Sequence, residues 1–437
     1  MRRRTIGRLT SLLAATAMVA VACTSSSSTT TPTSGAGGSA SPSIAGQTIT
    51  VLLPPWANVP KDILQTFTDQ TGVTVDLQVT GWDAIRNKVA VAGAANTPLA
   101  DVTEFDWSWT GQFGRAGWFL PLQDKLDPSL LDGLQNNGAF SIEGNQYAVC
   151  YSNDFRISAY NTKMFADAGI DQPPTTFDEL TADLQQIKDK GVAENPLTMP
   201  LSATEGTATV WYLLTLAYGG QLFDDNFQPA FTAPDSGGYQ ALQFMVDAVD
   251  KGFVTPGAVS LSDTQSDNRY TSGTAAVTLS GGPDEMVVAS KPNQSKIVGD
   301  ASFMLVPGLS GAGATFGLPE GLGIMTTSEH PDASIAFLEW WEQEDTQLAL
   351  QKSVGLLPCS TSAVQSLVDA GKLVGGDAIN QELQHVAPLF PQGAPPWYTD
   401  FSTKAAGLIN AAASGDLTVK DALDQLASEA QKLQSEG

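Results

Sequence analysis

The alternation of apolar and polar residues predicts strands and helices in turn along the first part of the chain. Residues 47–53 form a short apolar and β-branched run, typical of a buried strand, and residues 73–79 alternate strictly, typical of a strand with one buried face. Between them, residues 61–71 repeat apolar positions at helical spacing. A second helix at 82–92 and a strand at 100–103 continue the order. This order favours an α/β architecture with a largely parallel sheet.

The rest of the chain continues the mixture of helices and strands. Residues 151–161 have no helical period and are predicted to be extended, and Thr176 forms a capping box with Glu179 at the start of the next helix. The remaining predictions are helices at 207–218, 237–251, from 331 onward and in most of the tail from 377, with strands at 275–279, 303–307 and 323–326. We expect the last two strands to return to the first sheet.

The N-terminus has the pattern of an export signal. Four arginines among the first ten residues precede an apolar stretch at 9–21, which suits a secretory signal and is shorter than the roughly 20 residues that span a bilayer. Small residues stand directly before Cys23, as in a bacterial lipobox, so we expect cleavage after residue 22 and lipidation of Cys23. The alternative is an ordinary secretory signal. Residues 23–46 are rich in Ser, Thr, Gly, Ala and Pro, which predicts a flexible linker. The predicted location is extracytoplasmic, with a lipid anchor in the cell membrane.

The charge of the chain excludes several classes of partner. It has 46 acidic and 22 basic residues, and four of the basic ones lie in the predicted signal. Such a balance argues against nucleic acid, whose phosphates need a basic face, and against electrostatic docking on an anionic membrane. Only four arginines remain after the signal, too few and too scattered for a phosphate clamp. The length of 437 residues, 42% of them hydrophobic, predicts two or three globular domains.

The cysteines and histidines offer no catalytic or metal pattern. Cys150 and Cys359 are the only cysteines besides Cys23. In an oxidising compartment they favour a disulfide, and two buried free thiols are the alternative. His330 and His385 lie far apart without ligand-spaced neighbours, so we expect neither a metal nor a cofactor.

A series of short motifs runs in collinear order through about residues 47–365. The main ones are Thr71-Gly72-Val73-Thr74-Val75, Pro98-Leu99-Ala100-Asp101-Val102, Ala116-Gly117-Trp118-Phe119-Leu120-Pro121-Leu122, Tyr160-Asn161, Pro173-Pro174-Thr175-Thr176, Tyr218-Gly219-Gly220 and Gly355-Leu356-Leu357-Pro358. Together they resemble the family 1 extracellular solute-binding proteins of ABC importers. The sequence departs from that pattern at Cys150, where a proline is frequent, and at Cys359, where a polar or basic residue is frequent.

The resemblance implies an α/β, two-lobed, periplasmic-binding-protein-like fold in which a hinge links discontinuous lobes. The N-terminal lobe would comprise residues 47–149 plus 305–356, and the C-terminal lobe residues 154–302 plus 360–437. A ligand would sit between the lobes and be buried by hinge closure. Both Cys150 and Cys359 would lie where the chain crosses between lobes, so a disulfide there would restrain the hinge.

The loops at strand ends that face such a cleft supply the candidate ligand-binding residues. Aromatic rings suit the apolar face of a sugar, and carboxylates accept hydrogen bonds from its hydroxyl groups. For each candidate the alternative is structural, a tryptophan in the core or a carboxylate in a loop cap. The candidates are Trp56, Asn58, Asp106, Trp107 and Glu320 in the first lobe and Trp211, Asp284 and Trp397 in the second.

The function that follows from the resemblance is a substrate-binding lipoprotein of an ABC importer. It would capture a sugar or oligosaccharide and deliver it to a membrane permease, as a monomer without enzymatic activity. A polyamine or another small solute is an alternative ligand, because aromatic rings and carboxylates also attract ammonium groups. An exported glycoside hydrolase that uses two carboxylates is a weaker alternative, since no hydrolase signature accompanies the acidic residues.

Overall fold

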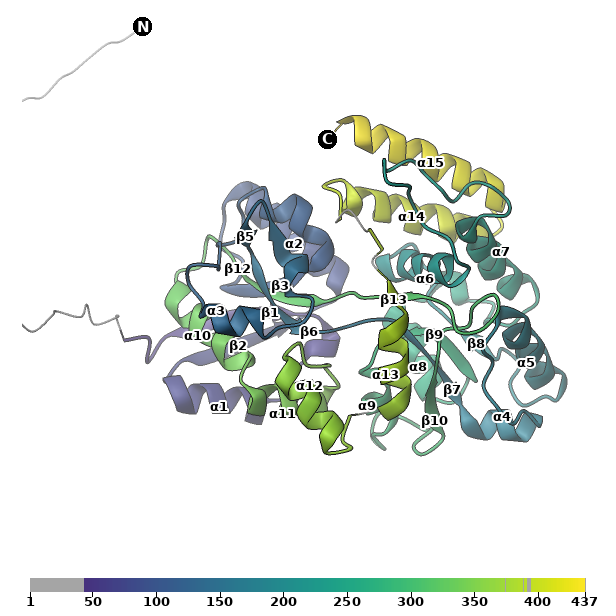
Figure 1. The fold of residues 1–437 in the computed structure, drawn as a ribbon, viewed down its shortest axis with the longest axis horizontal. Helices are drawn as coiled ribbons and strands as arrows, with labels where there is room; N and C mark the ends of the chain where they lie inside the picture. The colour runs from purple at the N-terminus through teal and green to yellow at the C-terminus, as the bar shows by residue number, and fades with distance from the viewer. Residues whose placement is uncertain (1–42, 374, 388, 391–393, 437) are drawn as a thin grey trace, which may run out of the picture. The chain divides into compact units, whose positions relative to one another are not determined.

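The described residues from 44 to 436 fold around two separate β-sheets, each covered by helices (Figure 1). The computed structural model describes residues 43–436 except 374, 388 and 391–393. The predicted signal peptide (1–22), Cys23 and the predicted linker up to residue 42 lie outside the described residues. Among the residues that are described, no helix is both long enough and apolar enough to cross a membrane.

The first sheet has five strands in the order β2-β1-β3-β12-β6. Strand β1 is parallel to β2 and β3, whereas β12 runs antiparallel to β3 and β6. The strands are β1 (Thr48–Leu53), β2 (Thr74–Val79), β3 (Val102–Asp106), β6 (Ala148–Ser152) and β12 (Glu320–Ile324). The helices of this lobe are α1 (Lys61–Thr71), α2 (Trp82–Ala95), α3 (Pro128–Asp132), α10 (Pro331–Trp341) and α11 (Glu344–Val354), and a short hairpin joins β4 (Ser141–Ile142) to β5 (Asn145–Gln146).

The second sheet has four strands in the order β10-β7-β9-β8. Only β8 and β9 are parallel; β7 runs antiparallel to both of its neighbours. The strands are β7 (Ile157–Asn161), β8 (Leu197–Thr198), β9 (Val277–Gly281) and β10 (Ala301–Met304). The helices are α4 (Thr162–Ala168), α5 (Phe177–Asp189), α6 (Glu205–Ala217), α7 (Gly237–Asp250), α8 (Asp263–Thr271), α9 (Glu285–Ala289), α12 (Thr361–Asp369), α13 (Gly376–Glu382), α14 (Tyr398–Ala413) and α15 (Val419–Glu436).

Local sequence signals account for several of these elements. The predicted helix at 61–71 is α1, which buries Leu64 and Phe67 and ends at Gly72 in the left-handed conformation, with a φ of 73°. The predicted capping box is confirmed at α5, where the Thr176 hydroxyl accepts the backbone N–H of Glu179 at 3.2 Å. The Glu179 carboxylate in turn accepts the backbone N–H of Thr176 at 3.1 Å.

One predicted strand belongs to a different sheet from the one expected, and the predicted boundary between the lobes shifts as a result. The predicted strand at 303–307 corresponds to β10, which pairs with β7 in the second sheet and not with the first. The chain then stays with the second lobe, because Val306, Phe316 and Leu318 are buried in the hydrophobic core around α6. Strand β11 (Thr315–Phe316) also pairs there, parallel to β13 (Val386–Ala387). The chain therefore crosses back to the first lobe just before β12. The expected lobe bounds had placed this crossing earlier, between residues 302 and 305.

The segments that join the two sheets lie next to each other. The backbone N–H of Asn153, between β6 and β7, donates to the carbonyl of Leu357 at 2.9 Å. A disulfide joins Cys150 in β6 to Cys359, with their Cα atoms 6.0 Å apart. Both cysteines are fully buried in a core that also contains Phe105. The bond therefore lies at the first-sheet end of the connecting segments.

Candidate functional site

A cavity of about 230 Å³ is lined by residues of both lobes. The first lobe contributes Trp56, Ser152 and Glu320, each at or just beyond a strand end. The second lobe contributes the segment after β9 and one face of α8. A small solute in this cavity would therefore contact both lobes at once.

The sheet register positions the first-lobe side of the cavity. Trp56 lies in a single helical turn (Pro55–Ala57) that directly follows β1, so its side chain extends from the end of that strand. Glu320 opens β12 and lies opposite Asp106 of β3 on one side and Ser152 of β6 on the other. Trp56 is half-buried, and its Nε1 is a buried donor without a hydrogen-bond partner.

Three buried carboxyl groups lie together behind this side of the cavity. Glu104, Asp106 and Glu320 are each less than 10% exposed. The Tyr151 hydroxyl donates to Oε2 of Glu104 at 2.7 Å, while burial and the neighbouring Asp106 raise the pKa of Glu104 well above its ordinary value. Burial also raises the pKa of Asp106 to about 6, although its carboxylate accepts the backbone N–H of Ser108 at 2.8 Å.

The second-lobe side of the cavity is also acidic. Asp154 forms an ion pair with Arg156, with Oδ2 and Nη1 3.3 Å apart, but burial still raises the pKa of Asp154 to about 7. Asp284 and Glu285 follow Gly281-Gly282 at the end of β9. Burial raises the pKa of both groups, and Asp267 raises that of Glu285 further. The cavity thus combines one guanidinium with many carboxyl groups.

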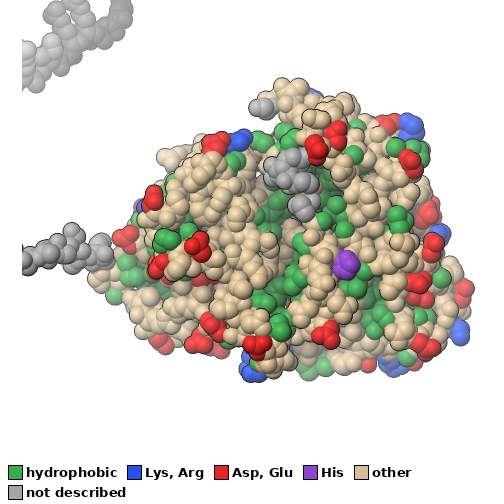
Figure 2. All heavy atoms as spheres, in the orientation of Figure 1, with side chains coloured by type: hydrophobic (Ala, Val, Ile, Leu, Met, Phe, Trp, Pro, Cys, Tyr) green, Lys and Arg blue, Asp and Glu red, His purple; other side chains and the backbone are tan. Residues whose placement is uncertain are grey.

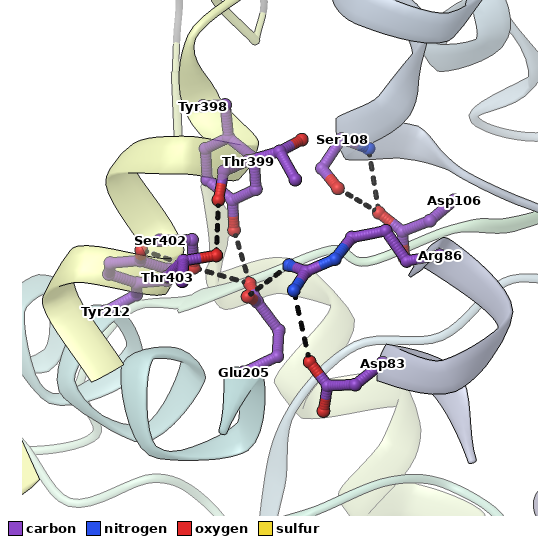
Figure 3. Close-up of polar contacts among 10 residues, drawn as sticks. All are labelled: Asp83, Arg86, Asp106, Ser108, Glu205, Tyr212, Tyr398, Thr399, Ser402 and Thr403. Atoms are coloured by element: carbon purple, nitrogen blue, oxygen red, sulfur yellow. Dashed lines mark hydrogen bonds and ion pairs between the residues drawn. The ribbon is translucent and has the colours of Figure 1, made fainter. Parts of the chain in front are cut away.

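A polar network connects the two lobes beside this cavity (Figure 3). Arg86 of α2 reaches Glu205 at the start of α6, with Nη1 and Oε2 3.8 Å apart, and also pairs with Asp83 at 3.5 Å. Oε1 of Glu205 accepts the hydroxyls of Tyr398 at 3.0 Å and Ser402 at 2.7 Å, both from α14. Burial raises the pKa of Glu205 to about 7 in spite of these contacts.

A second cavity, of about 930 Å³, is lined by Trp107 of the first lobe and Trp397 of the second. The Trp107 ring packs against Tyr398 and Phe390, at centroid distances of 5.2 and 6.5 Å. Arg115 is the one basic residue among the described residues that line it. This cavity is more aromatic and less acidic than the first.

The structure places the predicted ligand-binding residues in several different environments. Trp56, Asp284 and Glu320 line the 230 Å³ cavity, and Trp107 and Trp397 line the 930 Å³ cavity. Asp106 is buried and lines neither.

Asn58 and Trp211 lie outside both cavities. Asn58 is exposed. Trp211 is fully buried in the second-lobe core, where its Nε1 donates to the carbonyl of Gly238 at 2.8 Å. The expectation that Trp211 reaches a ligand therefore does not fit the structure, because α6 is buried on all of its faces.

The sequence predictions missed much of the acidic lining. Asp263 and Asp267 stand four positions apart on α8, which places both carboxylates on one helical face, and that spacing was a usable signal. Asp154 and Arg156 lie within the predicted extended segment 151–161, and Arg156 is one of few arginines in the chain. No local pattern indicated the pairing of Arg86 with Glu205, since it joins two lobes.

Among residues 43–436, apart from the undescribed positions, no group of three or more His, Cys, Asp or Glu side chains has a geometry that could hold a metal ion.

Comparison with known proteins identifies several relatives. The chain is 25% identical over 375 residues to the "Diacetylchitobiose binding protein DasA" of Streptomyces coelicolor, which covers 80% of this chain and 82% of the relative. It is 29% identical over 243 residues to the "Mannitol-binding protein" of Pseudomonas aeruginosa, about half of each chain (52%).

Solved structures share the fold. The maltose-bound MalE3 of T. maritima matches 88% of this chain and 99% of its own with a TM-score of 0.80 and 21% identity. A solute-binding protein of Agrobacterium radiobacter in complex with ribitol also has a TM-score of 0.80, with 19% identity over 89% of this chain and 99% of its own. These similarities show a two-lobed fold of the kind seen in periplasmic sugar-binding proteins.

The sequence model of one family, described as bacterial extracellular solute-binding protein, matches residues 56–348, about two thirds of the chain. That segment contains four of the five strands of the first sheet (β2, β3, β6 and β12) and all four strands of the second sheet. The chain belongs to the bacterial extracellular solute-binding proteins.

Proposed function

We propose that the protein is the substrate-binding lipoprotein of an ABC importer and captures a sugar or oligosaccharide between its lobes. The observation that carries this proposal is the 230 Å³ cavity, which combines an aromatic ring and hydrogen-bond acceptors from both lobes. A ligand that contacts both lobes favours the closed arrangement over the open one, and a permease can recognise that closed form.

The proposed roles of the lining residues follow from sugar chemistry. The ring of Trp56 would cover the apolar face of a sugar, and its unpaired Nε1 would donate to a hydroxyl oxygen. Glu320 and Asp284 would accept hydrogen bonds from hydroxyl groups on opposite sides of the ligand. Trp107 and Trp397 would stack on further units of an oligosaccharide in the larger cavity.

The relatives support a carbohydrate or polyol over other solutes. Two of them are named for diacetylchitobiose and mannitol, and two solved structures of the same fold hold maltose and ribitol. The proposal includes no catalytic step.

The N-terminal segment would fix the protein to the outer face of the cell membrane. In this proposal the signal is cleaved before Cys23, its sulfur is lipidated, and the linker lets a monomeric binding unit reach the permease. Mass spectrometry of the N-terminal peptide from the native host tests this part. A diacylglyceryl mass on Cys23 is expected, and an unmodified N-terminus at another residue would contradict the anchor.

A thermal-shift screen against sugars, polyols and polyamines tests the ligand class. A ligand at 100 times its dissociation constant stabilises a folded protein by about 2.7 kcal/mol, which is visible as a higher melting temperature. We expect a shift with one class of sugar or polyol and no turnover of that compound. Shifts with polyamines alone would change the ligand class, and hydrolysis of a glycoside without any shift would favour an enzyme.

A further inference from the structure

The lining of the 230 Å³ cavity carries more negative charge than hydroxyl recognition requires. Six carboxyl groups line it, and Arg156 is the only basic residue among its described lining residues. The six are Asp154, Asp263, Asp267, Asp284, Glu285 and Glu320. Arg156 forms an ion pair with Asp154 and also interacts electrostatically with Asp263, Asp284 and Glu320. Among the described residues, this one guanidinium is therefore shared by several carboxyl groups of the lining.

Glu285 is the most unusual member of this set. Its side chain is 5% exposed, and neither Oε1 nor Oε2 has a hydrogen-bond partner. The carboxyl group lies against the backbone of Gly281, where an added methyl group would come within 1.8 Å of Oε2. Gly281 itself lines the cavity, so the unpaired oxygens of Glu285 lie at its wall.

Two more carboxyl groups face each other across the next residue. A methyl group added to Gly282 would lie 2.6 Å from Oδ1 of Asp284, 3.0 Å from Oδ1 of Asp154 and 3.5 Å from Nη1 of Arg156. The absence of a side chain at Gly282 therefore allows two carboxyl groups and the guanidinium of Arg156 to approach this point of the cavity wall.

Burial makes this arrangement costly unless something compensates the charge. The pKa values of Asp267, Glu285 and Glu320 are raised well above their ordinary values, mainly by burial and then by neighbouring carboxyl groups. Burial also raises the pKa values of the other three groups, that of Asp154 to about 7 and those of Asp263 and Asp284 above their ordinary value, so all six resist ionisation beside a single guanidinium. Neutral hydroxyl groups can hydrogen-bond to carboxylates, but they leave the charge of an ionised carboxylate in place.

We infer that the solute bound in this cavity is an amine-bearing sugar whose ammonium group binds beside Glu285, between the carboxylates that flank Gly282. This inference deepens the proposed carbohydrate function and rests on it. An ammonium group has three donors and one positive charge, so it pairs with unpartnered acceptors and offsets their repulsion together.

Binding of an ammonium ion would release protons from the cavity. A nearby cation favours the ionised form of a carboxyl group, so the groups that burial keeps protonated would lose protons when the ligand binds. The titratable and charged groups around Glu285 are Asp267, Asp284, Arg156 and Tyr270, with Asp154, Asp263 and Glu320 elsewhere on the lining.

Calorimetric titration of the full-length protein with matched pairs of sugars tests the inference. The probes are glucosamine and chitobiose, each compared with its N-acetylated form, which keeps the sugar ring and its hydroxyl groups, adds an acetyl group and removes the charge. We expect the free amines to bind at least about tenfold more tightly than the acetylated sugars. Titrations in two buffers of different ionisation enthalpy should show protons released with the amines and none with the acetylated forms.

Substitution of Glu285 tests whether the preference for amine-bearing sugars depends on this residue. Glu285→Gln should weaken binding of the amines about tenfold and leave neutral sugars unchanged, while the exposed Glu194→Gln should change neither. Burial already favours the neutral form of Glu285, so the variant should fold. If the variant does not fold, the proton release measured on the unaltered protein still tests the inference.

The remaining outcomes separate the two proposals. Equal or tighter binding of acetylated or other neutral sugars, without proton release, would overturn the inference and leave the carbohydrate function intact. No binding of any sugar, charged or neutral, would overturn the proposed function and this inference with it.

Discussion

At the scale of single residues, the cavity lining includes buried polar atoms without a hydrogen-bond partner: Nε1 of Trp56 and both carboxyl oxygens of Glu285. An unpaired buried polar group costs about 1–3 kcal/mol, and a ligand that pairs with it removes that cost. The core also contains such atoms, Nε1 of Trp109 and of Trp341 among them. The position of Trp56 and Glu285 on the cavity, and not the missing partner alone, therefore makes them candidates for ligand contact.

Trp56→Ala is expected to weaken sugar binding at least about tenfold without a large loss of stability, because Trp56 is half-buried and lines the cavity. Isothermal titration calorimetry and thermal melting measure the two effects. Trp211→Phe is the matched control: it should lower the melting temperature and leave affinity unchanged. Unchanged affinity in Trp56→Ala would remove this ring from the site.

The free energy of unfolding is expected to fall as the pH rises from about 4.5 to 7. The pKa of Glu205 is raised to about 7 by burial, so the folded state binds its proton more tightly than the unfolded state does. The raised pKa values of Asp106 and Asp154 act in the same direction. Chemical denaturation at several pH values measures this slope.

Glu205→Gln should reduce that slope. Since a tenfold change in proton affinity is worth about 1.4 kcal/mol, removal of this one titration should recover up to about 3 kcal/mol near pH 8. The gain will be smaller where loss of the ion pair with Arg86 offsets it. A variant with the same slope as the unaltered protein would show that Glu205 does not titrate in this range.

At the level of residues, the rule that cleft residues stand at strand ends selected Trp56 and Glu320, which lie at the ends of β1 and β12 and line the cavity. Their part in ligand binding stays a prediction. Sequence reasoning placed Trp211 wrongly, although its helix, α6, is apolar on most of its faces, which is typical of a fully buried helix. It also missed Glu285, whose position depends on the approach of α8 and α9.

At the scale of elements, periodicity and caps predicted helices better than they predicted strand partners. The bounds of α1 and the capping box of α5 depend on neighbouring residues and were predicted correctly. The partner of β10 depends on contacts with distant segments. Its apolar pattern is the same whether it pairs with β7 or with the first sheet, so sequence alone assigned it wrongly.

Thr176→Ala is expected to lower the free energy of unfolding by about 1 kcal/mol, because it removes the acceptor for the backbone N–H of Glu179 at the start of α5. Denaturant titration measures the change. The exposed Thr97→Ala, outside any helix, serves as the control and should have almost no effect. An equal loss in both variants would contradict a specific role for the cap.

At the scale of the whole folded unit, the resemblance recognised in the sequence predicted the two lobes, while the exact crossing points required the structure. Acidic side chains are spread over the face of the molecule shown in Figure 2 and are not gathered into one patch. The concentrated negative charge lies instead in the cavity between the lobes. The overall acidity of the chain therefore bears on solubility, and the lining of the cavity bears on ligand choice.

The disulfide ties two segments that are 209 positions apart beside the inter-lobe connections. Replacing both partners, Cys150→Ser with Cys359→Ser, should lower the free energy of unfolding by about 2–5 kcal/mol, because the unfolded chain gains freedom. Denaturant titration of both forms, with and without reductant, checks this value. If reductant destabilises the unaltered protein no more than the double variant, the bond contributes nothing to stability.

The most direct test of the account is calorimetric titration of the full-length protein with diacetylchitobiose, chitobiose, maltose and mannitol, repeated with Trp56→Ala. The account predicts saturable binding at one site for at least one of these carbohydrates, with no turnover and with much weaker binding in the variant. An absence of heat with every carbohydrate, or release of hydrolysed sugar, would contradict the claim that this cavity captures a sugar for transport.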